Sequence, residues 1–262
     1  MFIDTHAHLD AEEFAADRYA VIERARSAGV VAFVSPAISA ASSAACVQLA
    51  RQHPGVWAAV GIQPNYAAEA ATDDWQLVEA MASETRVVAL GETGLDRHWD
   101  FTPFDVQQDY FDRHLRLAQA RDLPVVIHCR ESEGDMLPML REAVSRGPVR
   151  GVMHSFSGDG DFARECLDLG LYLSFSGAAT YTNKKFAALR RVAADAPSDR
   201  LLIETDSPYL VPHPLRGKEK RNEPANIVHT ASALADLRGV PLEQLAAETS
   251  ANARLLFRLP SH

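Results

Sequence analysis

Short apolar segments alternate with segments of helical periodicity along the whole chain of 262 residues. Eight of the apolar segments are rich in Val, Ile and Leu, as expected of strands that are buried on both faces. They lie at residues 2–5, 30–34, 56–62, 87–90, 124–128, 150–154, 171–175 and 201–204. Eight strand-then-helix units predict an α/β fold, namely a single (β/α)8 TIM barrel over residues 1–262. Two helical patterns, at 225–237 and 242–257, close the chain, so we expect an extra C-terminal helix; a doubly wound open sheet is the alternative.

The composition limits the classes of function. The formal net charge of −9 argues against a broad nucleic-acid interface of the repressor or histone kind. It leaves room for a nuclease whose positive charge is supplied locally by metal ions. The three scattered cysteines suggest a reducing compartment. With no secretory signal and no apolar run of membrane-spanning length, we expect a cytoplasmic protein with no membrane association and no obligate protein partner.

Six ionisable residues follow the C-terminal ends of predicted strands. In a barrel these ends form one ring at one face, where barrel enzymes carry their chemistry. The first two are histidines two positions apart, so their side chains project the same way from an extended chain. Four imidazoles and two carboxylates exceed what one metal with an open position needs, and they suit two metals that share a carboxylate. The six residues are His6, His8, Glu92, His128, His154 and Asp206.

Around these positions the sequence resembles the TatD-related metal-dependent deoxyribonucleases, a family of amidohydrolase-like barrels. The resemblance covers essentially the whole chain. It rests on residues 2–9, 91–96, 124–130, 154–158, 204–210, 221–224 and 252–257. The resemblance implies that the six residues are metal ligands in two sets joined by one bridge: His6, His8 and Asp206; His128 and His154; and Glu92 as the bridge.

The resemblance also implies a mechanism. Two divalent ions, Mg²⁺, Mn²⁺ or Zn²⁺, would lower the pKa of a water so that hydroxide attacks phosphorus near neutral pH. Asp206 and Glu92 are the expected catalytic carboxylates, and Asp206 would accept the proton of the water or orient it. The nitrogen-rich ligand set leans towards the later metals.

The expected substrate contacts are polar or cationic residues near the same strand ends. After the third strand the family reads Gly-Ile-His-Pro-His, whereas this chain has amides at the two histidine positions. Amides hydrogen-bond a phosphate but do not shuttle protons near neutral pH. We therefore expect metal binding to survive and the rate or substrate preference to change. The candidate substrate contacts are Arg130, Ser155, Ser157, Arg221, Gln63 and Asn65.

Three functions from different classes remain open. The first is a phosphodiesterase, a 3′-5′ exodeoxyribonuclease acting on single-stranded DNA or nucleic-acid ends. The second keeps the metals and hydrolyses a carbonyl ester or amide, for example the ester of an aminoacyl-tRNA. The third, a non-catalytic scaffold, is disfavoured by the full set of ligands. A cationic pocket for phosphate beside the metals would favour the first function over the second.

Several residues have plainer alternative interpretations. Arg130 is expected either to contact phosphate or to pair with Glu131 or Glu133. Glu204 is expected to orient a ligand through a buried hydrogen bond. Trp99 and Tyr209 are expected either to stack on a base or to pack. Surface positions are expected for the remaining histidines, which are His53, His98, His114, His213, His229 and His262.

Overall fold

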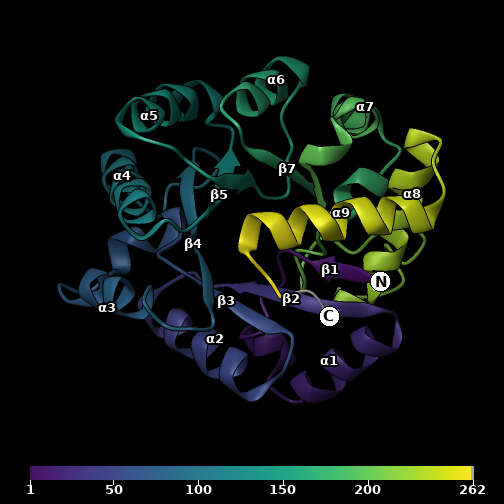
Figure 1. Ribbon diagram of the computed structural model, residues 1–262, viewed down its shortest axis with the longest axis horizontal. Coiled ribbons are helices and arrows are strands. Elements are labelled where there is room, and N and C mark those ends of the chain that lie inside the picture. Colours follow the sequence, from purple (N-terminus) through teal and green to yellow (C-terminus); the bar gives the residue numbers. More distant parts are fainter. Residues whose placement is uncertain (261–262) are drawn as a thin grey trace. The chain divides into compact units, whose positions relative to one another are not determined.

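The computed structural model describes residues 1–260, so the surface position predicted for His262 lies outside the described residues. Eight strands form one sheet in the sequential order β1 to β8 (Figure 1). The pairs β1–β2, β3–β4, β4–β5, β5–β6 and β7–β8 are parallel. Sequential parallel order is that of a (β/α)8 barrel and not of a doubly wound sheet, so the predicted fold class is confirmed. The strands are β1 (Phe2–Asp4), β2 (Val30–Pro36), β3 (Val56–Val60), β4 (Val87–Asp96), β5 (Val125–Arg130), β6 (Gly151–Met153), β7 (Tyr172–Phe175) and β8 (Leu201–Ile203).

Helices follow the strands as predicted. The α-helices are α1 (Arg18–Ser27), α2 (Ala40–Gln52), α3 (Asp74–Met81), α4 (Phe104–Arg121), α5 (Glu133–Arg146), α6 (Gly160–Asp168), α7 (Ala187–Asp195), α8 (Ile227–Arg238) and α9 (Leu242–Phe257). Short 3₁₀ helices are η1 (Glu12–Phe14), η2 (Pro64–Glu69), η3 (Gly177–Thr180), η4 (Lys184–Phe186), η5 (Ser198–Arg200) and η6 (Pro224–Asn226). Helix α9 follows α8 without a strand between them and lies next to it (Figure 1), which confirms the extra C-terminal helix. Within residues 1–260 no helix combines the length and apolar character needed to cross a membrane.

The described chain divides into two compact units. Unit 1 comprises residues 1–35, 155–163 and 172–260, and its core includes Ile3, Phe33 and Phe175. Unit 2 comprises residues 36–154 and 164–171, and its core includes Leu90 and Phe111. The single domain predicted for residues 1–262 stays a prediction.

Strand β4 is longer than the predicted segment 87–90, because Gly91 and Gly94 do not end it. All ten of its residues are buried, and its second half pairs with β5 through Thr93 opposite Ile127 and Gly94 opposite His128. A Cβ at Gly94 would collide with the His128 carbonyl oxygen, so only glycine permits this close approach. Glu92 therefore lies inside a strand instead of after it.

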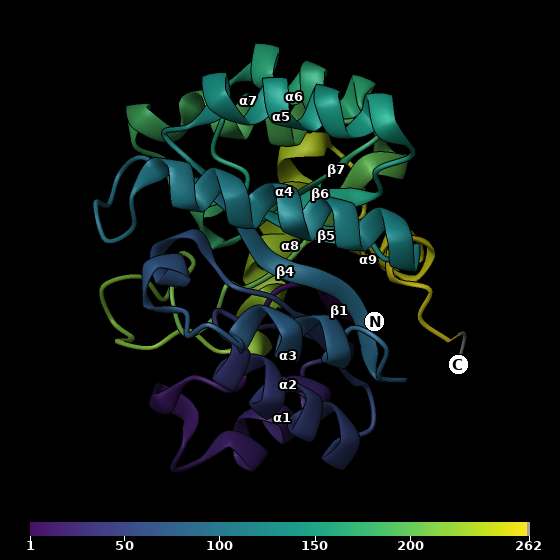
Figure 2. The same ribbon diagram turned by 90° about the vertical axis from the view of Figure 1, so that its left-hand side faces the viewer.

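Helix α4 runs along β4 (Figure 2) and buries a polar residue that the sequence analysis placed at the surface. His114 has no exposed surface, so that prediction is wrong. Its Nδ1 lies 2.6 Å from the Tyr110 carbonyl oxygen, and its Nε2 accepts a hydrogen bond of 3.1 Å from the Ile62 N–H. Both ring nitrogens are thus used by a neutral imidazole. Burial lowers the pKa of His114 to about 4.

We expect His114 to make the fold less stable in acid. Its pKa of about 4 in the folded chain lies below the ordinary histidine value of 6.5, so the unfolded chain takes up a proton first as the pH falls. This stabilisation is complete above pH 6.5 and is lost progressively towards pH 4. Between pH 7 and pH 5 the free energy of unfolding should fall by about 2 kcal/mol more in the wild type than in His114→Gln. Urea unfolding of both proteins at the two pH values measures this difference, and equal losses would contradict it.

Candidate metal centre

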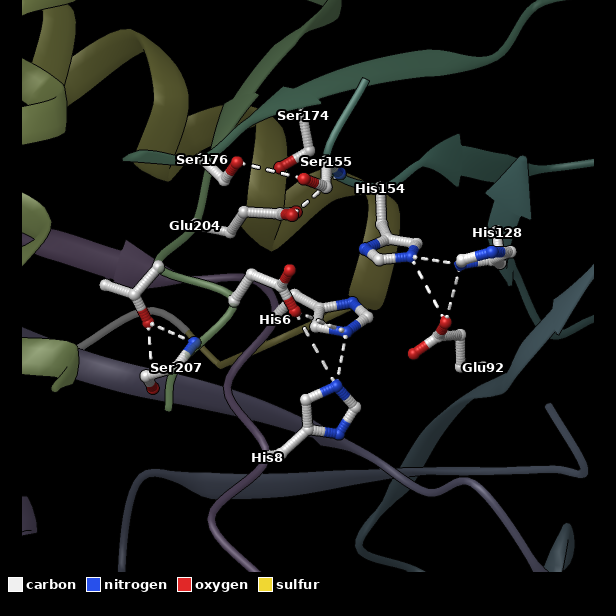
Figure 3. A network of polar contacts seen from close by, with 12 residues as sticks. His6, His8, Glu92, His128, His154, Ser155, Ser174, Ser176, Glu204 and Ser207 are labelled. Carbon is white, nitrogen blue, oxygen red and sulfur yellow. Dashed lines mark hydrogen bonds and ion pairs between the residues drawn. The ribbon is translucent and has the colours of Figure 1, made fainter. Parts of the chain in front are cut away.

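In unit 1, the end of β1 and the end of β8 bring together two histidines and an aspartate. The Nε2 atoms of His6 and His8 lie 3.2 Å apart and face each other (Figure 3). Each of these nitrogens lies 3.7 Å from Asp206 Oδ1. Asp206 is in the left-handed region at φ 52°, and its backbone N–H donates to the His6 carbonyl oxygen over 2.9 Å. The backbone thus fixes the carboxylate against the two imidazoles.

A buried carboxyl group, Asp4, connects the two strand ends that carry this first group. Its Oδ1 accepts from the backbone N–H of Thr205 at 3.0 Å and of His6 at 3.3 Å. Its Oδ2 accepts from the Thr205 hydroxyl at 2.6 Å. Burial raises the pKa of Asp4 to about 8, and the bonds from Thr205 and His6 offset only part of that effect. Asp4 therefore holds the backbone of the candidate ligand His6 and of Thr205, the residue directly before Asp206.

In unit 2, a second group is formed by Glu92, His128 and His154, whose side chains turn towards one another (Figure 3). Glu92 Oε1 lies 2.9 Å from His128 Nδ1 and 3.3 Å from His154 Nε2. The same two nitrogens are 3.3 Å apart. Burial lowers the pKa of His128, but hydrogen bonds to Asp96 and Glu92 raise it by more, so the net shift is upward.

Both groups have the spacing and chemistry of cation ligands. Ligands bound tetrahedrally at 2.0–2.1 Å are separated by about 3.3 Å from one another. The three ligand atoms of unit 1 are 3.2–3.7 Å apart, and those of unit 2 are 2.9–3.3 Å apart. Imidazole nitrogens and carboxylate oxygens are ordinary ligands for Zn²⁺, Mn²⁺ and related ions. The residues present in each unit therefore fit a divalent cation.

Asp96, to which the sequence analysis gave no role, holds one of the candidate ligands in place. His128 Nε2 lies 2.8 Å from Asp96 Oδ2, on the side of the ring opposite the nitrogen that faces Glu92. Asn65 Nδ2 donates to the same oxygen at 3.0 Å. Burial raises the pKa of Asp96, but the hydrogen bonds from His128, Asn65 and the Trp99 N–H lower it to a net value of about 2. The signal was available, because Glu92 and Asp96 lie four positions apart on one strand, and an even spacing places side chains on the same face.

We expect Asp96→Asn to weaken metal binding by about 10- to 100-fold, the usual effect of removing a carboxylate that orients a metal-bound histidine. The amide keeps the size of the side chain but loses the charge that fixes the His128 ring. Affinity is measured by competition with a chromophoric chelator, without substrate. Asp100→Asn is the matched control, because Asp100 is exposed. Equal affinities for the two variants would show that Asp96 has no such role.

The two amides that replace the family's histidines contact carboxylates of unit 2. Gln63 Nε2 donates to Glu92 Oε1 at 3.4 Å, and Gln63 Oε1 accepts from the Asn65 N–H at 2.8 Å. Asn65 reaches Asp96, as described above. These contacts orient the side chains around His128, which is a use the sequence analysis did not foresee. Substrate contact by Gln63 and Asn65 stays a prediction.

The two candidate arginines differ in their surroundings. Arg130 is exposed, and within residues 1–260 it makes no ion pair, so the alternative pairing with Glu131 or Glu133 is absent. Arg221, by contrast, donates to Asp17 at 2.8 and 2.9 Å and to Glu223 at 2.6 Å. Arg221 is therefore occupied by two carboxylates, which makes it a poor phosphate contact. The sequence does show one partner of Arg221, since Glu223 follows two positions later. The other partner, Asp17, is distant in the sequence and comes near only on folding.

The serines after β6 also differ. The Ser155 N–H donates to Glu204 Oε1 at 2.7 Å, and its hydroxyl lies 2.9 Å from that of Ser176 (Figure 3). Glu204 is buried and positions the backbone of Ser155, the residue directly after His154. The predicted buried hydrogen bond of Glu204 is thus present, and its role in orienting a metal ligand stays a prediction. Ser157 is exposed, and its contact with substrate stays a prediction.

Comparisons with known proteins identify relatives over nearly the whole chain. Residues 3–258 match the family described as TatD related DNase. The chain is 38% identical over 259 residues to the uncharacterized metal-dependent hydrolase YabD of Bacillus subtilis (strain 168), covering 99% of this chain and 100% of YabD. It is 35% identical over 259 residues to the 3'-5' ssDNA/RNA exonuclease TatD of Pantoea vagans (strain C9-1), covering 98% and 99% of the two chains.

A solved structure agrees with these relatives. The crystal structure of YJJV, a TatD homolog from Escherichia coli k12, matches with a TM-score of 0.92 and 31% identity, over 99% of this chain and 98% of that chain. The match to this family, over residues 3–258, includes the sequential parallel strands and both groups of histidines and carboxylates. This chain is therefore a member of the TatD related DNase family, and the resemblance noted in its sequence is confirmed.

Proposed function

We propose that this metal-dependent hydrolase cleaves phosphodiester bonds at the 3′ end of single-stranded DNA or a similar nucleic-acid end. The observation that carries the proposal is the pair of ligand groups, each with two imidazoles and one carboxylate. Relatives named as 3'-5' ssDNA/RNA exonucleases, at 35% identity over nearly the full chain, support the choice of bond and substrate. The net charge of −9 suits recognition of a strand end better than a long duplex.

We assign two divalent ions to the protein, one to each group. When bound, the ions would supply Lewis acidity that lowers the pKa of the attacking water towards neutrality. His6, His8 and Asp206 would hold one ion, and Glu92, His128 and His154 the other. The bridging role of Glu92 and the identity of the ions stay predictions from the family resemblance and the nitrogen-rich ligands.

Asp206 and Glu92 differ in exposure, which suits them to different roles in the reaction. Asp206 has 14% of its side chain exposed, compared with 4% for Glu92. Asp206, besides its role as a ligand, is exposed enough to take the proton from the attacking water, whereas the buried Glu92 would act mainly as a ligand. The oxygen of the water bonds to phosphorus and the bond from phosphorus to the 3′ oxygen breaks. That oxygen leaves with the proton that Asp206 has taken from the water. Arg130, the exposed arginine at the end of β5, would neutralise a phosphoryl oxygen.

The exposed Arg130 also separates the two hydrolase hypotheses. A carbonyl ester or amide needs no cation for a phosphate, whereas a phosphodiester carries a negative charge that an unpaired guanidinium stabilises. Arg130 is the last residue of β5 and lies in the same unit as one ligand group. This arrangement favours the phosphodiesterase.

A substrate panel with controlled metal content tests the proposal. Single-stranded DNA, duplex DNA, RNA, a simple carboxylic ester and aminoacyl-tRNA are incubated with purified protein, with protein treated with chelator, and with treated protein reloaded with Mg²⁺, Mn²⁺ or Zn²⁺. We expect mononucleotides to be released from the 3′ end of single strands, loss of this activity after chelation, and recovery with at least one of the metals. Faster cleavage of the carbonyl substrates than of every nucleic acid would instead support the alternative.

A further inference from the structure

Unit 2 carries an exposed pair of stacked aromatic rings in the segment after β4. Trp99 is 44% exposed and Phe101 is 61% exposed. Their ring centroids lie 5.3 Å apart, and the ring planes differ by 10°. Single exposed aromatic residues are common on protein surfaces. Here the two rings stack on each other, so each covers one face of the other, and the outer face and the ring edges of the stack remain as apolar surface. We call Trp99 and Phe101 the aromatic platform.

A cation accompanies this face. The Arg130 guanidinium carbon lies 5.6 Å from the centroid of the Trp99 ring, within the range of a cation–π contact. The neighbouring acidic residue, Glu131, is engaged by His98 at 2.8 Å. Arg130 itself makes no ion pair in the part of the chain that the structure describes. The platform therefore offers an apolar face and a cation together.

The platform is tied to the candidate metal ligands of the same unit. The backbone N–H groups of His98 and Trp99 donate to Asp96 Oδ1 at 2.8 and 3.1 Å. The other oxygen of Asp96 contacts His128 at 2.8 Å. One carboxylate thus positions both a ligand and the start of the segment that carries the platform.

Buried polar contacts also hold the rest of this segment. Gln107 in α4 accepts from the Asp96 N–H at 2.8 Å and donates to the carbonyl oxygens of Asp96 and Thr102 at 3.1 and 3.0 Å. The Thr102 hydroxyl in turn accepts from the Ala68 N–H at 3.2 Å. A segment fixed at both ends loses little conformational entropy when it binds a ligand. The exposed rings are therefore preorganised for binding.

We propose that the aromatic platform binds an unpaired nucleobase near the 3′ end of the substrate, with Arg130 on an adjacent phosphate. This inference rests on the proposed function, since it names the contact by which that site would take a single strand. Stacking on an aromatic face tolerates any base, and it requires a base that is not already stacked inside a duplex. The platform would thus make the enzyme selective for single strands without making it selective for sequence.

Binding measurements on the metal-loaded protein test the platform. The probe is a fluorescent oligothymidylate whose 3′ linkages are phosphorothioates, so that cleavage is slow. We expect Trp99→Ala and Trp99→Leu to raise the Kd by about 5- to 100-fold, as for the loss of one stacked base, and Trp99→Phe to recover much of the affinity. Leu retains an apolar side chain, so a loss shared by both variants reports the aromatic face and not a packing defect. Tyr19→Ala is the matched control, because Tyr19 is 65% exposed on α1 and belongs to no candidate site.

A second probe carries one abasic residue, moved in turn along the positions next to the 3′ end. At one of these positions, the missing base should weaken binding to the wild type as much as Trp99→Ala weakens binding of the intact strand. For Trp99→Ala itself, the abasic probe and the intact strand should bind with nearly the same Kd. Arg130→Ala should weaken binding of both probes and flatten the dependence of the Kd on salt. Wild-type affinity in Trp99→Leu would overturn the proposal, as would equal losses of affinity on the abasic probe in the wild type and in Trp99→Ala. Self-association of the protein through Trp99 and Phe101 would also overturn it, because a second copy would then cover the rings.

Cleavage of bis(p-nitrophenyl) phosphate by the wild-type protein keeps this result separate from the proposed function. If the wild type cleaves this substrate and Trp99→Leu binds the oligonucleotide with unchanged affinity, the proposed role of the aromatic platform is rejected and the proposed phosphodiesterase activity is retained. Absence of cleavage combined with the expected binding losses removes the phosphodiesterase and leaves a single-strand binding face.

Discussion

Replacing Asp206 by Asn should lower kcat for phosphodiester cleavage by about 10²- to 10⁴-fold, the range expected when a positioned acid–base group is lost. The amide keeps the shape of the side chain and one oxygen towards His6 and His8. It cannot accept a proton, however, and it brings no negative charge to a cation. The measurement is the steady-state rate on single-stranded DNA at saturating substrate and metal.

Two further observations make the Asp206 result interpretable. Thermal unfolding should be close to that of the wild type, because the backbone N–H of residue 206 still donates to the His6 carbonyl oxygen. Asp199→Asn is the control, since Asp199 is exposed in η5 and lies outside both ligand groups. If kcat for Asp206→Asn stays within a factor of three of the control, the proton-accepting role assigned to Asp206 is refuted.

Replacing His128 by Ala should abolish hydrolysis and remove close to one equivalent of bound metal per chain. The imidazole connects Glu92 on one side to Asp96 on the other, at 2.9 and 2.8 Å. Its loss removes one ligand of the unit 2 group and leaves two buried carboxylates without their shared donor. Because loss of an orienting partner alone costs about 10- to 100-fold in affinity, loss of the ligand itself should cost more. Metal content after native purification and the rate on single-stranded DNA are the two measurements.

His213→Ala is the matched control for this variant, because His213 is exposed and lies in neither ligand group. Asp96 keeps hydrogen bonds from Asn65 and from two backbone N–H groups, so the fold should survive in His128→Ala. A variant that remains folded, retains the wild-type metal content and turns over substrate at the wild-type rate would exclude His128 from the metal centre.

Much of the architecture follows from local patterns. The buried strands are short apolar runs, and the helices carry apolar residues at helical spacing, so element order alone indicated the barrel. The boundaries of β4 did not follow from such patterns. Gly91 and Gly94 suggested an end to the strand, but pairing with β5 continues it to Asp96. The extension depends on a partner strand more than 30 residues away, which no local pattern contains.

The polar residues show the same division. The sequence-based prediction places His114 at the surface, although it lies three residues after Phe111 and four before Ala118 on the buried face of α4. Helical spacing could have placed it correctly. Arg221 was chosen as a substrate contact because of its position after β8, but Asp17, 204 residues away in sequence, pairs with it. Its role depends on that distant partner.

By itself, the sequence determined the order of strands and helices and the six candidate ligands, four of which follow strand ends while Glu92 and His128 lie inside β4 and β5. Both depend on periodicity and position along the chain, which a sequence carries directly. Only the tertiary structure decided which polar groups support the candidate ligands. Asp96 lies behind His128, Asp4 lies between the two strand ends of unit 1, and Gln63 and Asn65 contact Glu92 and Asp96. A hydrogen bond acts over about 3 Å and depends on direction, so its partners are defined only once distant segments have been packed against each other.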